Sequence, residues 1–430
     1  MKKILCLLMV TVFAFICSAQ NPTKTPVLKA LKAAAMLDVK TGKLISSPVV
    51  LINGERIQNA GPNLTVPKGA EIIDLGDAVL IPGLIDCHTH VTTTYRFLLF
   101  GGPMHDAVRA PGNAKKTLES GITTVRELWS KDYTDVALRD AINSGEVIGP
   151  RMLVATLAIG STGGHNEDVL GLSPTISIND YIGIADGVDS VRKLVRTEIK
   201  YGADVIKIMA TEGAGEGNNV AVETQFTLAE MQAIVEEAHR YGKKVAAHAH
   251  GTDGIKISVR AGVDSIEHGT LLDDEAIRMM KEKGTYLVPT GYIWNYTPSE
   301  SESRTREEDP VKRERDQRFK EGSRRSFKQA VDAGIKIAMG SDSSVIPHGE
   351  NPKEVIWMAA NGMSRLQAIR AATMNAADLL GWADRVGSIE TGKYADIVAV
   401  RGNPLENIKL LENIPFVMKG GVVYKNEIRP

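Results

Sequence analysis

Two pairs of histidines, each with one residue between its members, are the side chains of this chain best suited to chemistry. His88 and His90 form one pair, and His248 and His250 form the other. On a β-strand, side chains two residues apart point to the same side, so each pair can present two imidazoles to one point. Imidazoles that converge in this way can chelate a divalent metal ion. The pairs therefore predict a metal site.

Two further metal-competent residues, His268 and Asp342, each end a short apolar run. Imidazole and carboxylate groups are rarely buried unless a partner satisfies them, so independent core packing explains their positions poorly. A barrel of parallel strands would gather such residues, although they lie far apart in the sequence, because its active site forms where the strands end.

The middle of the chain alternates apolar runs with amphipathic stretches, such as one in which Leu228, Met231, Ile234, Val235 and Ala238 recur at helical spacing. This alternation is typical of a parallel sheet with crossover helices, and eight such units predict an α/β fold, a closed (β/α)₈ TIM barrel. The eight apolar runs are 78–90, 122–128, 151–159, 204–210, 244–251, 265–269, 285–290 and 336–342.

Both ends of the chain have a different texture, with short β-rich runs and turns but no helical pattern between them. The first lies between residues 31 and 81, with Asn53-Gly54 as a hairpin signal, and the second between residues 396 and 423. We therefore expect one small β-sandwich domain built from residues 20–80 and 384–430, beside a barrel of residues 81–383.

The first 19 residues resemble an export signal. Lys2 and Lys3 precede an apolar run from 4 to 16, and small residues end at Ala19. This run is shorter than the roughly 20 residues that span a bilayer, so no stable membrane anchor is expected. We predict cleavage near Ala19 and a periplasmic or secreted protein.

Charge and cysteine content exclude two classes of protein. Without the signal, 49 basic and 52 acidic residues leave a net charge of −3, which does not favour nucleic-acid binding. Cys87 is then the one remaining cysteine, so no internal disulfide can form. The partner is expected to be a small molecule, and the sequence does not decide between a monomer and a homo-oligomer.

A segment rich in Ser, Glu and Arg, residues 297–325, follows the seventh run. Such a composition is typical of a solvated loop and an exposed helix. An insertion after a barrel strand also projects over the active face, so a lid is the alternative.

Taken in order along the chain, these motifs resemble the amidohydrolase superfamily, specifically its prolidase-like, imidazolonepropionase-related branch. The resemblance covers nearly all of the chain after residue 19 and includes a β-domain split between both ends. Its landmarks are LIPGLIDCHTH at 80–90, VIKIMA at 205–210, VAAHAHG at 245–251, SIEHG at 265–269, GSD at 340–342 and GSIETGKYADI at 387–397.

The resemblance implies a centre with two divalent metal ions, zinc being the expected metal, and adds Lys207 to the candidate ligands. In the matching families this lysine carries a carboxyl group that bridges the metals. His88, His90 and Asp342 would then hold the first ion, and His248 and His268 the second. Spacing alone does not separate His248 from His250, so that choice rests on the resemblance.

The chemistry implied is attack of a metal-bridging hydroxide on an amide carbonyl, with Asp342 moving the proton to the leaving amine. His165 matches the family position that contacts the substrate carbonyl; a loop histidine bonded to backbone is the alternative. His250 is left to meet a substrate carboxylate, with Arg126 and Tyr292 as helpers. Arg126 could equally belong to a buried ion pair, perhaps with Glu127 or with an acid from a loop. For His348 the two possibilities, a substrate contact and a structural histidine, stay open.

The resemblance implies hydrolysis of dipeptides or N-acyl amino acids, including Xaa-Pro and ochratoxin-type amides. A cyclic-amide hydrolase and a catalytically silent binding protein are the alternatives. A deaminase is a further alternative, but the mononuclear deaminases of the superfamily do not need the bridging lysine, so Lys207 argues against that class. One departure concerns specificity, because Glu212 stands where the branch usually has glycine after the lysine strand. A carboxylate at that edge of the site is expected either to disfavour an acidic leaving group or to recruit a substrate amine.

Overall fold

The computed structural model describes residues 28–93, 102–167, 182–213, 224–296 and 310–428. The predicted signal peptide, residues 1–19, lies outside this part, so export stays a prediction. Among the described residues, no helix is long and apolar enough to cross a membrane.

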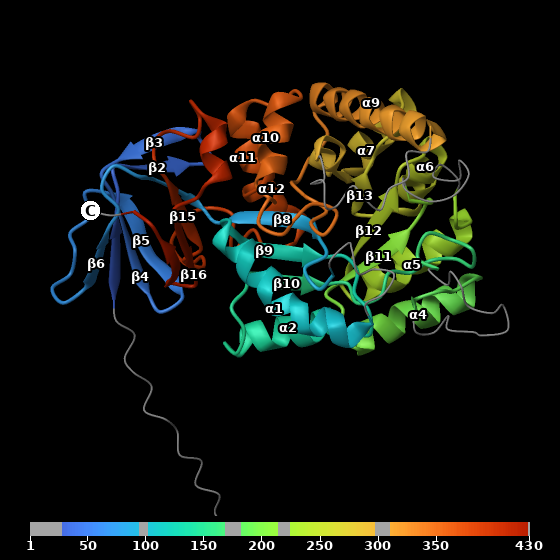
Figure 1. The fold of residues 1–430 in the computed structure, drawn as a ribbon, viewed down its shortest axis with the longest axis horizontal. Helices are drawn as coiled ribbons and strands as arrows, with labels where there is room; N and C mark the ends of the chain where they lie inside the picture. Colours follow the sequence, from blue (N-terminus) through green and yellow to red (C-terminus); the bar gives the residue numbers. More distant parts are fainter. Residues whose placement is uncertain (1–27, 94–101, 168–181, 214–223, 297–309, 429–430) are drawn as a thin grey trace, which may run out of the picture.

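Strands and helices alternate through the middle of the chain (Figure 1). The strands are β8 (Leu84–Thr89), β9 (Ile122–Glu127), β10 (Arg151–Val154), β11 (Val205–Met209), β12 (Lys244–Ala249), β13 (Ser265–His268) and β14 (Tyr286–Val288). The helices are α1 (Pro103–Glu119), α2 (Thr134–Asn143), α4 (Val188–Lys200), α5 (Leu228–Arg240), α6 (Thr252–Ala261), α7 (Asp274–Lys283), η3 (Gly291–Asn295), α9 (Pro310–Ala333), α10 (Lys353–Ala360), α11 (Arg365–Ala371) and α12 (Met374–Leu379).

These strands form two parallel sheets, ordered β10-β9-β8 and β11-β12-β13-β14. Isolated parallel bridges extend them: Ile159 pairs with Ile208, Leu287 with Ile337 and Thr89 with Ser343. The α/β class and the parallel strands are therefore confirmed, while closure into a barrel stays a prediction.

Two of the eight predicted runs differ from the observed strands. The run 336–342 contributes one bridge, at Ile337, instead of a strand. The run 78–90 divides at Gly83, because the strand before it, β7 (Val79–Pro82), pairs antiparallel with β15 (Ile397–Val400) in another sheet. A Cβ on Gly83 would lie 2.2 Å from the Thr123 hydroxyl, so this crossing point needs glycine.

The small β region combines both ends of the chain, seen in Figure 1 as blue strands beside dark red ones. Its sheets are ordered β5-β4-β1-β6 and β17-β16-β15-β7-β2-β3. One hydrophobic cluster contains Leu31 and Val50 from the first sheet and Leu80 and Phe416 from the second. The other strands and η4 are β1 (Lys29–Lys32), β2 (Ala35–Asp38), β3 (Lys43–Ser46), β4 (Pro48–Asn53), β5 (Arg56–Pro62), β6 (Glu71–Asp74), η4 (Ile408–Glu412), β16 (Phe416–Lys419) and β17 (Val422–Asn426).

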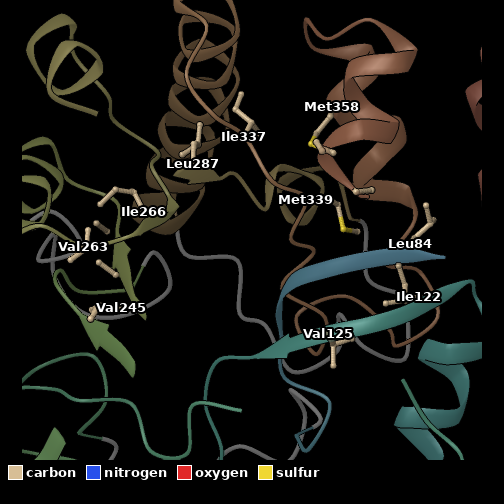
Figure 2. Close-up of a cluster of buried hydrophobic side chains, with 14 of the residues drawn as sticks. Leu84, Ile122, Val125, Val245, Val263, Ile266, Leu287, Ile337, Met339 and Met358 are labelled. Carbon is tan, nitrogen blue, oxygen red and sulfur yellow. The ribbon is translucent and has the colours of Figure 1, made fainter. Parts of the chain in front are cut away.

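A larger hydrophobic core lies between the parallel strands and their helices. Leu84 of β8 pairs opposite Ile122 of β9, and Figure 2 shows both side chains together at this position. Helix α5 begins with a capping box at Thr227 and buries Met231 and Ile234 against this core. Burial of each such side chain contributes about 1.5 to 3 kcal/mol, which anchors the strands whose ends carry the site.

The segment 297–325 is described only from Pro310 onward, and residues 297–309 lie outside the described part. Its described portion belongs to α9, which contacts η3 and buries Phe319. This portion has both exposed and buried side chains, so the expected exposed helix is present but packs in part against its neighbours, and whether the segment forms a lid stays open.

Candidate metal centre

The predicted ligands come together where the parallel strands end. Two groups have ligand atoms that lie within 4.8 Å of one another: the first is His88, His268 and Asp342, and the second is His248, His250 and His268. His268 belongs to both groups, so the two potential metal positions are adjacent. All five residues are buried.

The first group joins the end of β8 to the loop that carries Asp342. Oδ1 of Asp342 lies 3.1 Å from Nε2 of His90 and 3.6 Å from Nε2 of His88. Burial raises the pKa of Asp342, but the charges and hydrogen bond of the two histidines outweigh this effect and hold the pKa well below its usual range. Asp342 is therefore a carboxylate, as a metal ligand or a general base must be.

In the second group, two ring nitrogens converge. Nε2 of His268 lies 2.9 Å from Nδ1 of His248. The remaining nitrogens are taken, because Nδ1 of His268 lies 2.7 Å from the Thr290 hydroxyl and Nε2 of His248 lies 3.3 Å from the Glu212 carbonyl oxygen. These contacts leave the facing nitrogens to share one ion.

His250 also belongs to this group, so grouping alone does not separate it from His248. Its ring stacks on His268 at 4.6 Å between centroids, and its Nδ1 lies 2.7 Å from the Thr270 hydroxyl. Burial lowers the pKa of His250 to about 3 and the pKa of His248 well below its usual value. Both rings are therefore neutral and able to bind a cation.

The backbone at the strand ends is strained where it presents ligands. His268 has φ 69° and Asp342 has φ 56°, both in the left-handed region that non-glycine residues seldom adopt. Such a conformation costs about 1 to 3 kcal/mol and persists where the surrounding structure enforces it, often at active sites.

Lys207 lies in β11 and is almost fully buried, close enough for its charge to act on His248 and Asp342. Burial lowers its pKa to about 8, although the charges of Glu267 and Asp342 act in the opposite direction. A lysine with this pKa is partly neutral near pH 8, and a neutral amine is the form that reacts with carbon dioxide.

Arg126 is held in a buried ion pair, the alternative to a substrate contact. Its NH2 group donates to Oε1 of Glu267 at 2.7 Å, and its Nε donates to the Cys87 carbonyl. The predicted partner Glu127 is wrong: its carboxylate instead accepts the backbone N–H groups of Val91 and Thr92. The NH1 group of Arg126 donates to the Ser265 hydroxyl, so the three nitrogens of the guanidinium are all engaged, which favours the structural role.

Glu267 is a functional candidate that the sequence reading missed. Its Oε2 accepts from Nδ1 of His88 at 2.8 Å, which fixes the tautomer and leaves Nε2 of His88 for a metal. Burial raises the pKa of Glu267, but Arg126 and His88 lower it to about 2. The available signal was the acidic residue inside the apolar motif SIEHG, next to His268. An acid buried at such a position needs a cationic partner.

Asp86 is a second missed residue, and it joins the two segments of the first group. One of its oxygens accepts the backbone N–H of His88 and of Ser341, the residue before Asp342. The other accepts from the side chains of Ser341 and Asn351. Asp86 thus sets the spacing between the end of β8 and the Asp342 loop.

The remaining predicted substrate contacts are placed differently. His165 stacks on His248 at 4.5 Å, so the structure brings it to the second group. Tyr292 is half-buried on η3, with its hydroxyl 3.4 Å from Glu350. Nε2 of His348 lies 3.0 Å from the Thr93 carbonyl, which favours the structural role for this histidine.

Glu212 is partly engaged. Its carboxylate accepts from the Gln225 side chain at 2.7 Å, and its carbonyl faces His248. The predicted effect of its charge on specificity stays a prediction.

Comparisons with known proteins place this geometry in a family. The model of the amidohydrolase family matches residues 79–425. Ochratoxinase from Aspergillus niger is 34% identical over 372 residues, covering 81% of this chain and 76% of the relative. Imidazolonepropionase from Geobacillus sp. (strain WCH70) is 25% identical over 362 residues, covering 76% of each.

A solved structure agrees in fold. The crystal structure of a Xaa-Pro dipeptidase with bound methionine in its active site matches with a TM-score of 0.87 and 37% identity, covering 93% of this chain and all of that one. The family is metal-dependent, in accord with the two histidine groups. The chain belongs to the amidohydrolase family and is a hydrolase that acts on carbon–nitrogen bonds.

Proposed function

We propose that this protein is a two-metal amidohydrolase that hydrolyses the amide bond of dipeptides or N-acyl amino acids. The observation that carries the proposal is the pair of ligand groups that share His268. Similarity to a Xaa-Pro dipeptidase and to ochratoxinase supports the same substrate class. The name of the first relative specifies a dipeptide, and the name of the second specifies ochratoxin.

The donor set fits two divalent ions, zinc being the expected metal. His88, His90 and Asp342 would hold the first ion, and His248 and His268 the second, with carboxylated Lys207 between them. Supporting this fit, Nδ1 of His90 is buried without a hydrogen-bond partner among the described residues. The neutral imidazoles and the ionised carboxylate are the protonation states that metal binding requires.

We propose that the strands close into a (β/α)₈ barrel, with a small β-sandwich from residues 20–80 and 384–430. The bridges that continue both parallel sheets, at Ile159, Ile337 and Ser343, support closure. The hydrophobic cluster shared by both β-sheets supports the sandwich. We further propose export with cleavage near Ala19, on the strength of the apolar run after Lys3.

The ions, when bound, would acidify water and polarise the scissile carbonyl. The residues of the chain supply the rest. The Asp342 carboxylate accepts a proton and returns it to the leaving amine, which needs a group that is ionised before the reaction. His165, stacked on His248, can donate a hydrogen bond to the oxygen that gains negative charge.

His250 is the proposed contact for the substrate carboxylate. Thr270 holds its Nδ1, which leaves Nε2 as the nitrogen that faces a ligand. Tyr292 remains a candidate helper, whereas the ion pair with Glu267 favours the structural alternative for Arg126.

The test is a panel of dipeptides and N-acyl amino acids assayed with added zinc and bicarbonate. We expect hydrolysis of several of them. Asp342→Asn should lower kcat by roughly 10³-fold, because it removes the proton acceptor, whereas the exposed Asp384→Asn should leave kcat unchanged. Hydrolysis of a cyclic amide such as an imidazolone, with no activity on the panel, would replace the proposal by the cyclic-amide alternative.

A further inference from the structure

The turn after β14 connects the second ligand group to a short helix. The Thr290 hydroxyl contacts Nδ1 of His268, and the next residue begins η3. Thr290 itself has φ 47°, a strained conformation for a β-branched residue. The position of η3 is therefore tied to that of His268.

Helix α10 fixes the position of η3 through contacts with its first residues. The buried carboxylate of Glu354 accepts the backbone N–H groups of Gly291 at 2.9 Å and Tyr292 at 2.7 Å. Gly291 also lies directly on the Trp357 ring, since a Cβ at this position would approach that ring to 2.1 Å. These contacts fix η3 before any substrate arrives, which lowers the cost of binding.

Trp294 on η3 and Phe319 on α9 form an aromatic pair beside His250. Their rings stack at 5.9 Å with an interplanar angle of 15°. Phe319 lies 5.4 Å from the His250 ring and Trp294 lies 6.4 Å from it, both edge to face. Phe319 is almost fully buried and Trp294 is half-buried, so Trp294 is the member of the pair whose ring can contact a bound molecule.

The indole of Trp294 also carries a hydrogen-bond donor with no use in the described structure. Its Nε1 is shielded from solvent and has no acceptor among the described residues. Buried indole N–H groups usually find a partner, so this one calls for an acceptor that is supplied from elsewhere. A bound substrate with an oxygen at this position would supply it.

We propose that Trp294, with Phe319 behind it, forms a subsite for an apolar side chain on the amino acid released from the amide, and donates its indole N–H to that amino acid. The proposal rests on the function proposed above, because it uses His250 as the carboxylate contact. When the carboxylate of the released amino acid contacts His250, the side chain of that amino acid lies within reach of Trp294 and Phe319. The substrate class is thereby narrowed to amides of apolar amino acids.

The first test measures binding of the released amino acid, independently of turnover. L-Phenylalanine and glycine are titrated into the zinc-loaded protein by calorimetry. We expect phenylalanine to bind at least about tenfold more tightly to the wild type, and Trp294→Ala to reduce this ratio to less than about threefold. Trp294→Phe should keep the preference while weakening both ligands, because an aromatic ring remains at this position but the N–H is lost.

Tyr241→Ala, which removes an exposed ring on α5 remote from the ligand groups, is the matched control and should retain the wild-type ratio. Equal binding of phenylalanine and glycine to the wild type would overturn the proposal. An equal weakening of both by Trp294→Ala, with the preference retained, would overturn it as well.

The second test compares N-acetyl-phenylalanine with N-acetyl-glycine as substrates. A ratio of kcat/KM that depends on Trp294 supports both proposals. Failure of the wild type to hydrolyse either substrate, together with Trp294-dependent binding of phenylalanine, would contradict the proposed function and leave the subsite intact.

Discussion

The two ligand groups are supported in different ways. In the first, Nδ1 of His88 donates to the Glu267 carboxylate, which is itself paired with Arg126. In the second, Nδ1 of His268 and Nδ1 of His250 are held by the neutral hydroxyls of Thr290 and Thr270. A carboxylate partner makes an imidazole a stronger ligand than a hydroxyl does. The first position should therefore bind its ion more tightly, and the second should be the one that exchanges.

Glu267→Gln gives the largest expected effect. The carboxylate offers one oxygen to Arg126 and the other to His88, whereas an amide has a single acceptor oxygen and cannot serve both. We expect the affinity for the first ion to fall about 10- to 100-fold, and the free energy of unfolding to fall by about 3 kcal/mol because Arg126 loses its buried partner.

Metal titration and denaturant unfolding of this variant measure the two effects. Glu237→Gln is the control, since that buried acid on α5 pairs with Arg196, away from the ligand groups. Unchanged affinity for both ions in Glu267→Gln would remove the distinction between the two positions.

His250→Ala tests which histidine of the second group binds metal. If His250 meets the substrate carboxylate, the variant loses a charge-assisted hydrogen bond, and kcat/KM should fall about tenfold or more while metal content stays the same. Substrates with the carboxylate blocked as an amide should be poor for the wild type and little affected by the variant. Loss of one ion from His250→Ala would reverse the assignment of His248 and His250.

Thr290→Val should have the smallest effect. It removes a neutral hydrogen bond to His268 while keeping the shape of the side chain, a loss of about 1 kcal/mol or roughly fivefold in affinity. We expect this change for the second ion, and Thr290→Ser, which keeps the hydroxyl, should restore the affinity in a competition assay with a chelator. An effect as large as that of Glu267→Gln would show that hydroxyl and carboxylate support are equivalent here.

The ligands themselves could be predicted because few residue types bind metals and because period-two spacing on strands restricts where they point. His88, His248, His268 and Asp342 were found in this way, and the structure brings them together. Lys207 needed the resemblance, since a lysine in an apolar strand gives no signal of its own.

The supporting residues could not be predicted, because their partners are remote in sequence. Glu267 lies 141 residues from Arg126 and 179 from His88. The division of the first run at Gly83 depends on the approach of Thr123, and the role of Trp294 depends on the side-by-side placement of η3 and α9. Local patterns carry no information about such contacts.

The central claim is a two-metal centre with unequal positions. Metal-free protein titrated with zinc at pH 8 in the presence of bicarbonate should take up two ions per chain in two separate steps. Activity should appear with the second step, and Lys207→Ala should lose the second step. Full activity with one ion per chain, or in protein with no tightly bound metal, would contradict the account.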